Sequence, residues 1–254
     1  MKKTIFKGAG VALVTPMNKE GSVNYETLEQ LIEFQIKNGT DAIITCGTTG
    51  ESATLSPEEK RKVIKFTIEK TAKRIPVIAG TGCNNTQAAL MSSLEAQELG
   101  ADGLLIVTPY YNKTSQSGLV KHYTYIADRV HIPIILYNVP SRTGVNIKPE
   151  TCAELAKHPN ICAIKEASGD ISQVAKIKDL CGDNLDIYSG NDDQIVPLLS
   201  LGGIGVISVF SNICPRECHL LVKEYLEENT KIASKMQIKY LELMNAMFCD
   251  VNPI

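Results

Sequence analysis

The sequence predicts an α/β protein built as a (β/α)8 TIM barrel with an additional C-terminal helix. Its 254 residues match the usual size of one such barrel. Eight short apolar runs, rich in branched side chains, recur roughly every 25 to 30 residues between longer amphipathic segments. Most runs are continuously apolar, as parallel strands covered on both faces are. A doubly wound open sheet is the alternative, but it often carries a G-x-G-x-x-G turn after its first strand, which this chain lacks.

The expected strands are the apolar runs themselves, each of which ends at a turn or a polar residue. In chain order they are residues 10–15, 42–46, 76–79, 103–108, 133–137, 161–165, 185–189 and 205–209. In a barrel the C-terminal ends of all strands open on one face, where reactive residues gather.

The segments between the runs carry helix signals. Apolar residues from Leu28 to Ile36 recur at helical spacing and stop before Gly39. Ser56-Pro57-Glu58-Glu59 combines a capping box with a proline at the first helical position. Residues 86–99 end at Gly100, a natural C-terminal stop. We therefore expect helices between the strands, as the barrel requires.

Two parts are expected: residues 1–212 as the catalytic barrel and residues 213–254 as a C-terminal helical segment. Apolar residues at helical spacings continue from Leu220 to Met244. The chain stops at Asn252-Pro253-Ile254 without a capping segment, so we expect this helical segment to be truncated.

The composition argues against several classes of function. The net charge is −2, no long basic run occurs and Trp is absent, which argues against nucleic-acid partners. Residues 194–215 are uncharged and long enough to span a bilayer, but their Pro and Gly residues favour a short helix followed by a buried strand. Lys7 and Pro16 interrupt the N-terminal apolar run, so no secretion signal is expected. We expect a cytoplasmic protein without a membrane partner.

The cysteines and glycines point to no metal or phosphate site. The eight cysteines fit a reducing compartment, and none forms a C-x-x-C pair. Cys214 and Cys218 lie one helical turn apart but lack the further ligands of a zinc site. Gly202, Gly203 and Gly205 precede the eighth strand, at the wrong end of a barrel for phosphate.

Lys165 is the most informative residue at a strand end. It closes the run of residues 161–164, and period-two alternation places it on one face with Ile161 and Ala163. If that face points into the barrel, the low-dielectric interior disfavours the ammonium, and the neutral amine can attack a carbonyl to form a Schiff base. The alternative is that Lys165 pairs with an acid at a strand end.

Other strand ends carry polar groups with two interpretations each. Tyr137 closes the fifth strand and can relay protons with a Thr hydroxyl, or simply pack with its own hydroxyl in water. Thr48 and Thr49 follow the second strand and offer hydroxyl and N–H groups to a carboxylate. Arg142, in the loop after Tyr137, can clamp a carboxylate or stay solvated.

Four motifs resemble those of the dihydrodipicolinate synthase family, in the same order and spacing over the whole chain. They are Gly47-Thr48-Thr49-Gly50-Glu51, Thr108-Pro109-Tyr110-Tyr111-Asn112, Tyr137-Asn138-Val139-Pro140-Ser141-Arg142-Thr143-Gly144 and Ile164-Lys165-Glu166-Ala167. The resemblance implies a barrel that condenses pyruvate with L-aspartate 4-semialdehyde to 4-hydroxy-tetrahydrodipicolinate. That reaction is the first committed step toward diaminopimelate and lysine.

The resemblance also implies roles for the catalytic residues. Lys165 forms the imine with pyruvate, so no separate cofactor is needed. Tyr137 gives and takes protons, relayed through Thr48 to Tyr111. Relatives supply the residue matching Tyr111 from a neighbouring subunit. The resemblance therefore implies a homo-oligomer, at least a dimer, and usually a tetramer built as a dimer of dimers.

The substrate carboxylates have their own positions by the same resemblance. Thr49, with the backbone around Gly190 and Ile207, holds pyruvate. Arg142 binds the carboxylate of the semialdehyde. N-acetylneuraminate lyase, a related pyruvate aldolase, lacks this arginine and typically has Ser-Thr at the position of Thr48-Thr49. A non-catalytic remnant of the family is a further alternative, but the joint retention of the catalytic residues argues against it.

The sequence departs from lysine-inhibited members at the effector site. Ser52, Ala53, Asn84 and Tyr110 match such members, but Lys60 stands where they have His. Pro57 replaces a second His, and Ala88 replaces a Glu that would bind lysine. The charge of Lys60 repels a cationic effector, so we expect a vestigial site with weak or no lysine inhibition. Members usually continue a few dozen residues past Ile254, so we expect a C-terminally shortened or naturally short member.

Overall fold

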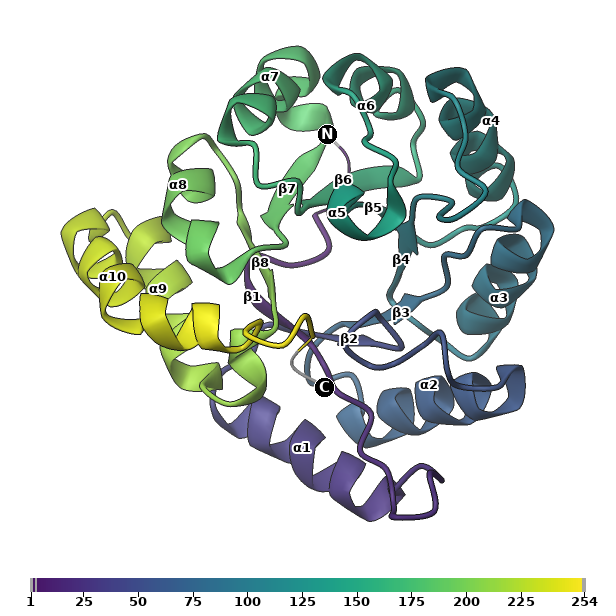
Figure 1. Cartoon of the computed structure of the whole chain (residues 1–254), viewed down its shortest axis with the longest axis horizontal. Coiled ribbons are helices and arrows are strands. Elements are labelled where there is room, and N and C mark those ends of the chain that lie inside the picture. The colour runs from purple at the N-terminus through teal and green to yellow at the C-terminus, as the bar shows by residue number, and fades with distance from the viewer. Residues whose placement is uncertain (1, 3, 253–254) are drawn as a thin grey trace.

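The computed structural model describes residues 2 and 4–252 and shows a closed barrel of parallel strands (Figure 1). Each strand pairs with the next along the chain, and β8 closes the ring on β1. The strands are β1 (Gly8–Ala12), β2 (Ala42–Thr45), β3 (Val77–Gly80), β4 (Gly103–Val107), β5 (Ile134–Asn138), β6 (Ile161–Glu166), β7 (Asp186–Ser189) and β8 (Gly205–Ser208). The predicted fold class is therefore confirmed.

The predicted strands match the observed ones with shifted ends. The largest shift is in β1, predicted over residues 10–15 and observed over Gly8–Ala12. Its start lies earlier because Gly8 pairs with Gly205 of β8. Its end lies earlier because the Val14 N–H bonds the Asn212 side chain at 3.1 Å, and Val14 no longer pairs with β2.

Helices surround the barrel and separate successive strands (Figure 1). They are α1 (Tyr25–Lys37), α2 (Pro57–Thr71), α3 (Thr86–Glu98), α4 (Gln116–Ala127), α5 (Pro140–Thr143), α6 (Pro149–Leu155), α7 (Ile171–Cys181), α8 (Ile195–Ser200), α9 (Pro215–Leu226) and α10 (Thr230–Ala246). The capping box at α2 is present: the Glu59 N–H donates to Ser56 Oγ at 3.2 Å, and the Ser56 N–H donates to Glu59 Oε2 at 2.8 Å. Because α9 follows β8, it is the last helix of the barrel, and α10 is the addition.

Two hydrophobic layers hold the barrel together. The first lies inside the ring of strands and includes Ile44, Ile78 and Leu105. The second lies between the strands and the surrounding helices and includes Leu28 of α1 and Val63 of α2. Both faces of each strand are therefore buried, which explains why the runs are continuously apolar.

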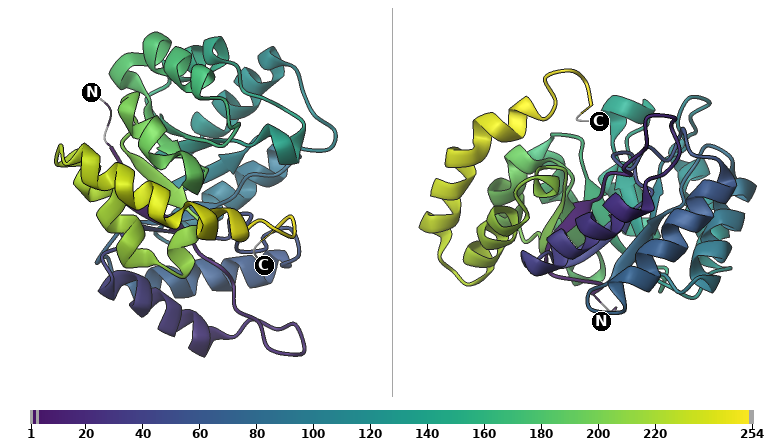
Figure 2. Two further views of the ribbon diagram at one scale, coloured as in Figure 1. Left: turned by 60° about the vertical axis from the view of Figure 1, so that its left-hand side comes forward. Right: turned by 90° about the horizontal axis from the view of Figure 1, so that it is seen from below.

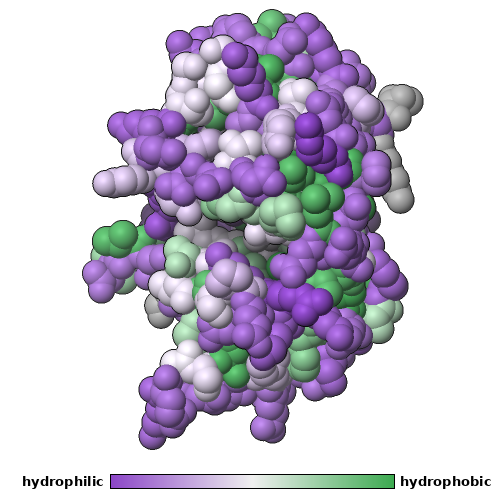
Figure 3. Space-filling model, turned by 90° about the vertical axis from the view of Figure 1, so that its right-hand side faces the viewer, coloured by the Kyte–Doolittle hydropathy of each residue, from purple (hydrophilic) through white to green (hydrophobic). Residues whose placement is uncertain are grey.

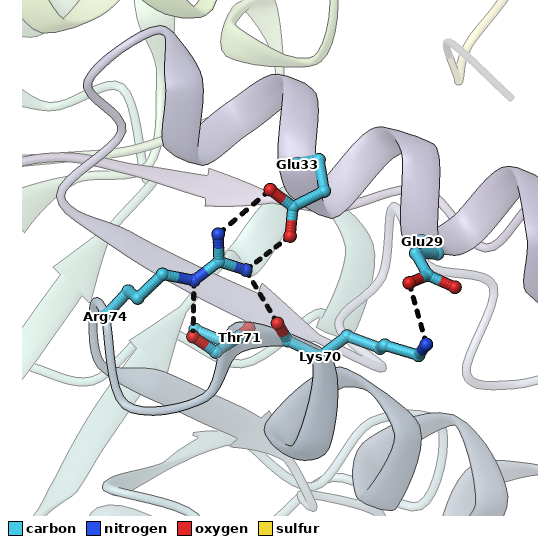
Figure 4. A network of polar contacts seen from close by, with 5 residues as sticks. All are labelled: Glu29, Glu33, Lys70, Thr71 and Arg74. Carbon is cyan, nitrogen blue, oxygen red and sulfur yellow. Dashed lines mark hydrogen bonds and ion pairs between the residues drawn. The ribbon is translucent and has the colours of Figure 1, made fainter.

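Polar contacts also join α1 to α2 at the surface (Figure 4). The Arg74 guanidinium pairs with both carboxylate oxygens of Glu33, and Lys70 Nζ lies 2.7 Å from Glu29 Oε1. Arg74 also donates to the carbonyls of Lys70 and Thr71. These side chains are solvent-exposed or half-buried, so each pair contributes little to stability.

The uncharged stretch of residues 194–215 folds as part of the barrel. It contains α8 and β8, a short helix and a buried strand, as its pattern predicted. Among residues 2 and 4–252, no helix combines the length and apolar character needed to cross a membrane.

Candidate active site

Lys165 lies inside the barrel at the C-terminal end of β6. Only 4% of its surface is exposed, and its neighbours in register are Tyr137 on β5 and Tyr188 on β7. Its Nζ lies 4.4 Å from the centroid of the Tyr137 ring. Its ammonium belongs to no ion pair within residues 2 and 4–252, although its charge reaches the carboxyl of Asp192, which follows β7.

The alternation predicted along β6 is right for Ala163 and wrong for Ile161. Ala163 packs inside the barrel, whereas Ile161 packs in the outer layer. The cause is a register shift, since Ile134 and Ile135 of β5 pair with Ile161 and Ala163, which leaves Cys162 as an extra residue. An extra residue of this kind exchanges the two faces of a strand. The shift thus brings Lys165 inward although Ile161 points outward.

A cavity of about 660 Å³ opens above Lys165 at the C-terminal ends of the strands. It brings together six of the residues that the sequence singled out: Lys165, Tyr137, Thr48, Thr49, Arg142 and Gly190. Ile207 does not line it, because its side chain is fully buried in the barrel interior. Tyr111 does not line it either. Its side chain is 90% exposed, and its backbone is left-handed with φ +66°.

A second cavity, of about 580 Å³, adjoins the first and shares Thr48, Tyr137 and Arg142 with it. Four residues of the expected effector site line this second cavity: Ser52, Ala53, Lys60 and Tyr110. Asn84 does not line it. Asn84 borders a separate cavity of about 380 Å³, where its carbonyl accepts a hydrogen bond from Asn112 Nδ2 at 3.1 Å.

The segment after Tyr137 was predicted as a loop and is one turn of helix, α5. Pro140 occupies its first position, and Gly144 ends it in the left-handed conformation with φ +68°. This turn places Arg142 at the border of both cavities. Proline fits a first helical position and glycine a left-handed end, so the sequence does carry this signal.

Gly190 lies next to Lys165, where a side chain at position 190 would have no room. A Cβ at this position would lie 2.6 Å from Ala167 Cβ and 3.1 Å from Lys165 Cε. The glycine N–H donates to the Glu166 carbonyl at 2.7 Å, which ties the end of β7 to the end of β6. Any larger residue would displace Lys165 or Ala167.

Asp192 is a residue of this cavity to which the sequence assigned no role. Its Oδ2 accepts hydrogen bonds from the N–H groups of Val209 (3.0 Å) and Phe210 (2.9 Å). Its Oδ1 has no protein partner within residues 2 and 4–252. Burial raises the pKa of the Asp192 carboxyl, an effect opposed by the nearby Ser208 hydroxyl, by these backbone hydrogen bonds and by the charge of Lys165. The only sequence signal was its position, two residues after Gly190.

The end of α10 and the residues after it form one wall of the cavity. Met244, Phe248 and Val251 line it, and Arg142 Nη2 donates to the Val251 carbonyl at 3.3 Å. Figure 2 shows this C-terminal end on the same side of the barrel as α5, opposite the N-terminal end. The sequence predicted a helix here but not its contact with the site.

A buried glutamine connects α10 to Asp192. Gln237 Nε2 donates to the Asp192 carbonyl at 2.9 Å, and Gln237 Oε1 accepts from the Val196 N–H at 3.1 Å. Both the nitrogen and the oxygen of the Gln237 amide are therefore hydrogen-bonded. Through these bonds α10 holds the segment that follows β7.

Metal ligands do not gather around the site. Within residues 2 and 4–252, no group of three His, Cys, Asp or Glu side chains is arranged to hold a metal ion. All eight cysteines are free thiols. Cys46 borders the second cavity, and burial raises its pKa to about 11, so this thiol stays protonated at neutral pH.

Comparisons with known proteins identify the family of this chain. Residues 5–254 match the dihydrodipicolinate synthetase family. The 4-hydroxy-tetrahydrodipicolinate synthase of Clostridium perfringens (strain SM101 / Type A) is 58% identical over 250 residues, which cover 98% of this chain and 86% of that protein.

Two solved structures have the same fold over nearly the whole chain. The chloride-inhibited dihydrodipicolinate synthase from Acinetobacter baumannii, complexed with pyruvate, is 45% identical with a TM-score of 0.97, covering 99% of this chain and 86% of that one. DHDPS from Cyanidioschyzon merolae, with lysine bound, is 40% identical with a TM-score of 0.96, covering 99% and 86%. The chain belongs to the dihydrodipicolinate synthetase family.

Proposed function

We propose that this chain is a 4-hydroxy-tetrahydrodipicolinate synthase, which condenses pyruvate with L-aspartate 4-semialdehyde on the route to diaminopimelate and lysine. The observation that carries the proposal is the buried Lys165, which forms no ion pair with the described residues and shares a cavity with Tyr137 and Arg142. The relatives named for this activity support it, as does the relative complexed with pyruvate.

Lys165 supplies the nucleophile. Its neutral amine attacks the keto carbon of pyruvate, and the carbinolamine loses water to give an imine on Nζ. Loss of a methyl proton turns the imine into an enamine, whose carbon attacks the aldehyde of the second substrate. The amino group of that substrate then attacks the imine carbon and displaces Lys165, which closes the ring and restores the free amine.

Tyr137 is the residue placed to move protons in these steps. Its ring lies beside Lys165 Nζ, and its side chain lines both cavities together with Thr48. A hydroxyl at this place can protonate the leaving water and later accept a proton. Thr48 relays the proton toward Tyr111 of a second subunit.

A homodimer is the smallest complete enzyme in this proposal. Tyr111 lies outside both cavities of its own chain and is 90% exposed, so its hydroxyl serves a neighbouring chain. Met91 of α3 and Tyr125 of α4 are also exposed. Figure 3, which faces this side of the molecule, shows hydrophobic patches between hydrophilic residues. Such patches suit the contact between the two subunits of a dimer. Two of these dimers then form the proposed tetramer.

Pyruvate is held at its carboxylate. Thr49 is buried and lines the cavity, and the backbone around Gly190 and Ile207 lies at the ends of β7 and β8. Hydroxyl and backbone N–H groups suit a carboxylate that must stay in one orientation during imine formation.

The direct test of this function is borohydride trapping with pyruvate, followed by intact mass and peptide mapping, together with turnover of both substrates. We expect one pyruvate-derived adduct, on Lys165, and product only when the semialdehyde is present. A folded protein that gives no adduct would rule out the imine mechanism. An adduct without turnover of the semialdehyde would point to another pyruvate aldolase.

Arg142→Ala is expected to impair use of the semialdehyde more than imine formation. The guanidinium borders both cavities and can hold the carboxylate of the second substrate, whereas pyruvate binds deeper, near Lys165. Loss of one charge-assisted carboxylate contact should raise the KM for the semialdehyde by about 10- to 100-fold.

The same preparation is used to measure the rate of borohydride trapping with pyruvate. This rate should stay within about threefold of the wild-type rate. Arg216, an arginine at the start of α9, provides the matched control Arg216→Ala, which should change neither quantity. Equal loss of trapping and semialdehyde use in Arg142→Ala contradicts the assignment.

Lysine is expected to inhibit the enzyme weakly or not at all. Lys60 lines the second cavity without an ion pair among residues 2 and 4–252, so its charge repels a cationic effector. Inhibition is measured as activity against lysine concentration. The double variant Lys60→His with Ala88→Glu should gain sensitivity, while Lys62→His on the exposed face of α2 should not. A micromolar or low-millimolar inhibition constant for the wild type would overturn this expectation.

A further inference from the structure

We propose that a network of four side chains, the buried Asn138, Glu166 and Gln173 with the half-buried Asn146, is the positioning device that sets Lys165 and Tyr137 for imine formation. This inference rests on the proposed function, since it explains how the reacting pair of that site is held. None of the four touches the cavity, so their effect passes through the residues next to them.

The network centres on the Glu166 carboxylate, which is 3% exposed. Its Oε2 accepts hydrogen bonds from Asn138 Nδ2 at 2.9 Å and Gln173 Nε2 at 3.1 Å. Its Oε1 accepts one from the Ser168 N–H at 2.6 Å. Three donors thus converge on one buried carboxylate, a pattern that only an acceptor without N–H or O–H groups can satisfy.

The amides close the network on themselves. Asn138 Nδ2 also donates to Asn146 Oδ1 at 2.8 Å, and Asn146 Nδ2 donates to Gln173 Oε1 at 2.7 Å. Gln173 Nε2 donates in return to Asn146 Oδ1 at 3.1 Å. Each amide nitrogen of the network donates and each amide oxygen accepts, so the four side chains have a single consistent arrangement.

The register of β5 and β6 connects this network to the chemistry. Tyr137 pairs with Lys165, and the next residue of each strand, Asn138, pairs with Glu166. Because successive residues of a strand point to opposite faces, the reacting pair faces the interior and the bonded pair faces the surrounding helices. The 2.9 Å bond between Asn138 and Glu166 therefore fixes the distance between the two strand ends that carry Tyr137 and Lys165.

The network also reaches β7 and the segment that carries Arg142. The Glu166 carbonyl accepts from the Gly190 N–H at 2.7 Å, and Asn138 Oδ1 accepts from the Ile147 N–H at 2.9 Å. Residues 139–146 are thus held at both ends, by Asn138 and by Asn146. One polar cluster supports the ends of three strands and the α5 turn.

This role predicts the effect of Glu166→Gln, which keeps the shape of the side chain but turns one acceptor into a donor. The new amide must face the N–H of Ser168 or the amides of Asn138 and Gln173. A shift of the strand end by up to about 1 Å follows. We expect the single-turnover rate of imine formation with pyruvate to fall on the order of 100-fold, since misplacement by about 1 Å costs that much.

The double variant Glu166→Gln with Gln173→Glu provides the decisive rescue. It exchanges carboxylate and amide between the two positions, so the new amide on β6 can donate to the new carboxylate on α7 while still accepting from Ser168. The Asn138 amide, itself a donor, then keeps only its bond to Asn146, so the rescue is partial. The number of charges and amides is unchanged. We expect the double variant to recover at least about 10-fold of the lost rate, whereas a role of the Glu166 charge alone predicts no recovery.

Gln35→Glu is the matched control for a buried amide exchanged with a carboxyl away from the site. Gln35 Nε2 donates to the Ser211 carbonyl at 2.8 Å, and the substitution removes that donor. It should lower the melting temperature and leave the rate of imine formation unchanged. If Glu166→Gln does not fold, Gln173→Met removes both the donor and the acceptor that Gln173 supplies to the network, and it should slow imine formation several-fold.

The measurement is rapid-quench borohydride trapping of each folded variant with pyruvate, with the melting temperature recorded beside it. Slower trapping in Glu166→Gln and recovery in the double variant support the inference. A lower melting temperature with wild-type trapping overturns it, as does a slow double variant that recovers nothing. Failure of the wild type itself to trap pyruvate would instead refute the proposed function.

Discussion

Replacing Lys165 with Ala is expected to abolish the pyruvate adduct and to lower kcat by roughly 1,000-fold or more, because the reaction loses its only covalent nucleophile. The side chain is 4% exposed, and no ion pair within residues 2 and 4–252 depends on it. Its removal should therefore leave the fold intact. The measurement is borohydride trapping by intact mass, together with steady-state turnover and circular dichroism.

Lys165→Arg separates the nucleophile from the charge. The guanidinium stays charged at any working pH and cannot form an imine, so this variant should be as inactive as Lys165→Ala. If either variant still forms an adduct elsewhere and turns over both substrates, Lys165 is not the residue that carries the chemistry.

Gly205→Ala is expected to have the largest effect on stability. A Cβ at this position would lie 2.1 Å from the Gly8 carbonyl oxygen, a backbone atom on the neighbouring strand. Gly8 and Gly205 pair in register where β8 meets β1, so the overlap lies at the closure of the barrel. The clash is with a backbone atom, which cannot move aside as the end of a flexible side chain can. We therefore expect a loss of about 3 kcal/mol or more in the free energy of unfolding.

Chemical denaturation followed by circular dichroism measures this loss. Gly47→Ala is the matched control, because a Cβ there would meet only Ile44 Cγ2 at 3.8 Å, an ordinary contact. Gly47→Ala should change the free energy of unfolding by less than about 1 kcal/mol. Similar values for the two variants would show that close packing at the β1–β8 contact is not the reason for Gly205.

The barrel was predictable from the sequence because its strands are buried on both faces. Continuous apolar runs such as residues 103–107 and 161–164 need no knowledge of their partners to be recognised. Lys165 was predictable for the same reason, since a charged residue that ends such a run must lie at a strand end. The extra residue at Cys162 could not be predicted from the sequence, because a register shift depends on the neighbouring strand.

The parts of the site that were missed depend on contacts between distant segments. Asp192 acquires its role from the N–H groups of Val209 and Phe210, which no local pattern announces. Phe248 looks like one more apolar residue of a helix, and only the path of α10 across the barrel brings it to the cavity. Asn138 and Glu166 were visible in the motifs, but their bond follows from strand pairing.

The C-terminal wall of the cavity carries a natural attachment point for a reporter group. Of the eight thiols, Cys249 is exposed, whereas Cys83 and Cys214 are half-buried and the other five are buried. Cys249 directly follows Phe248, whose side chain lines the cavity. A thiol-reactive fluorophore used at limiting concentration should therefore label the wild-type chain here first. Its emission would then follow substrate arrival without an engineered cysteine.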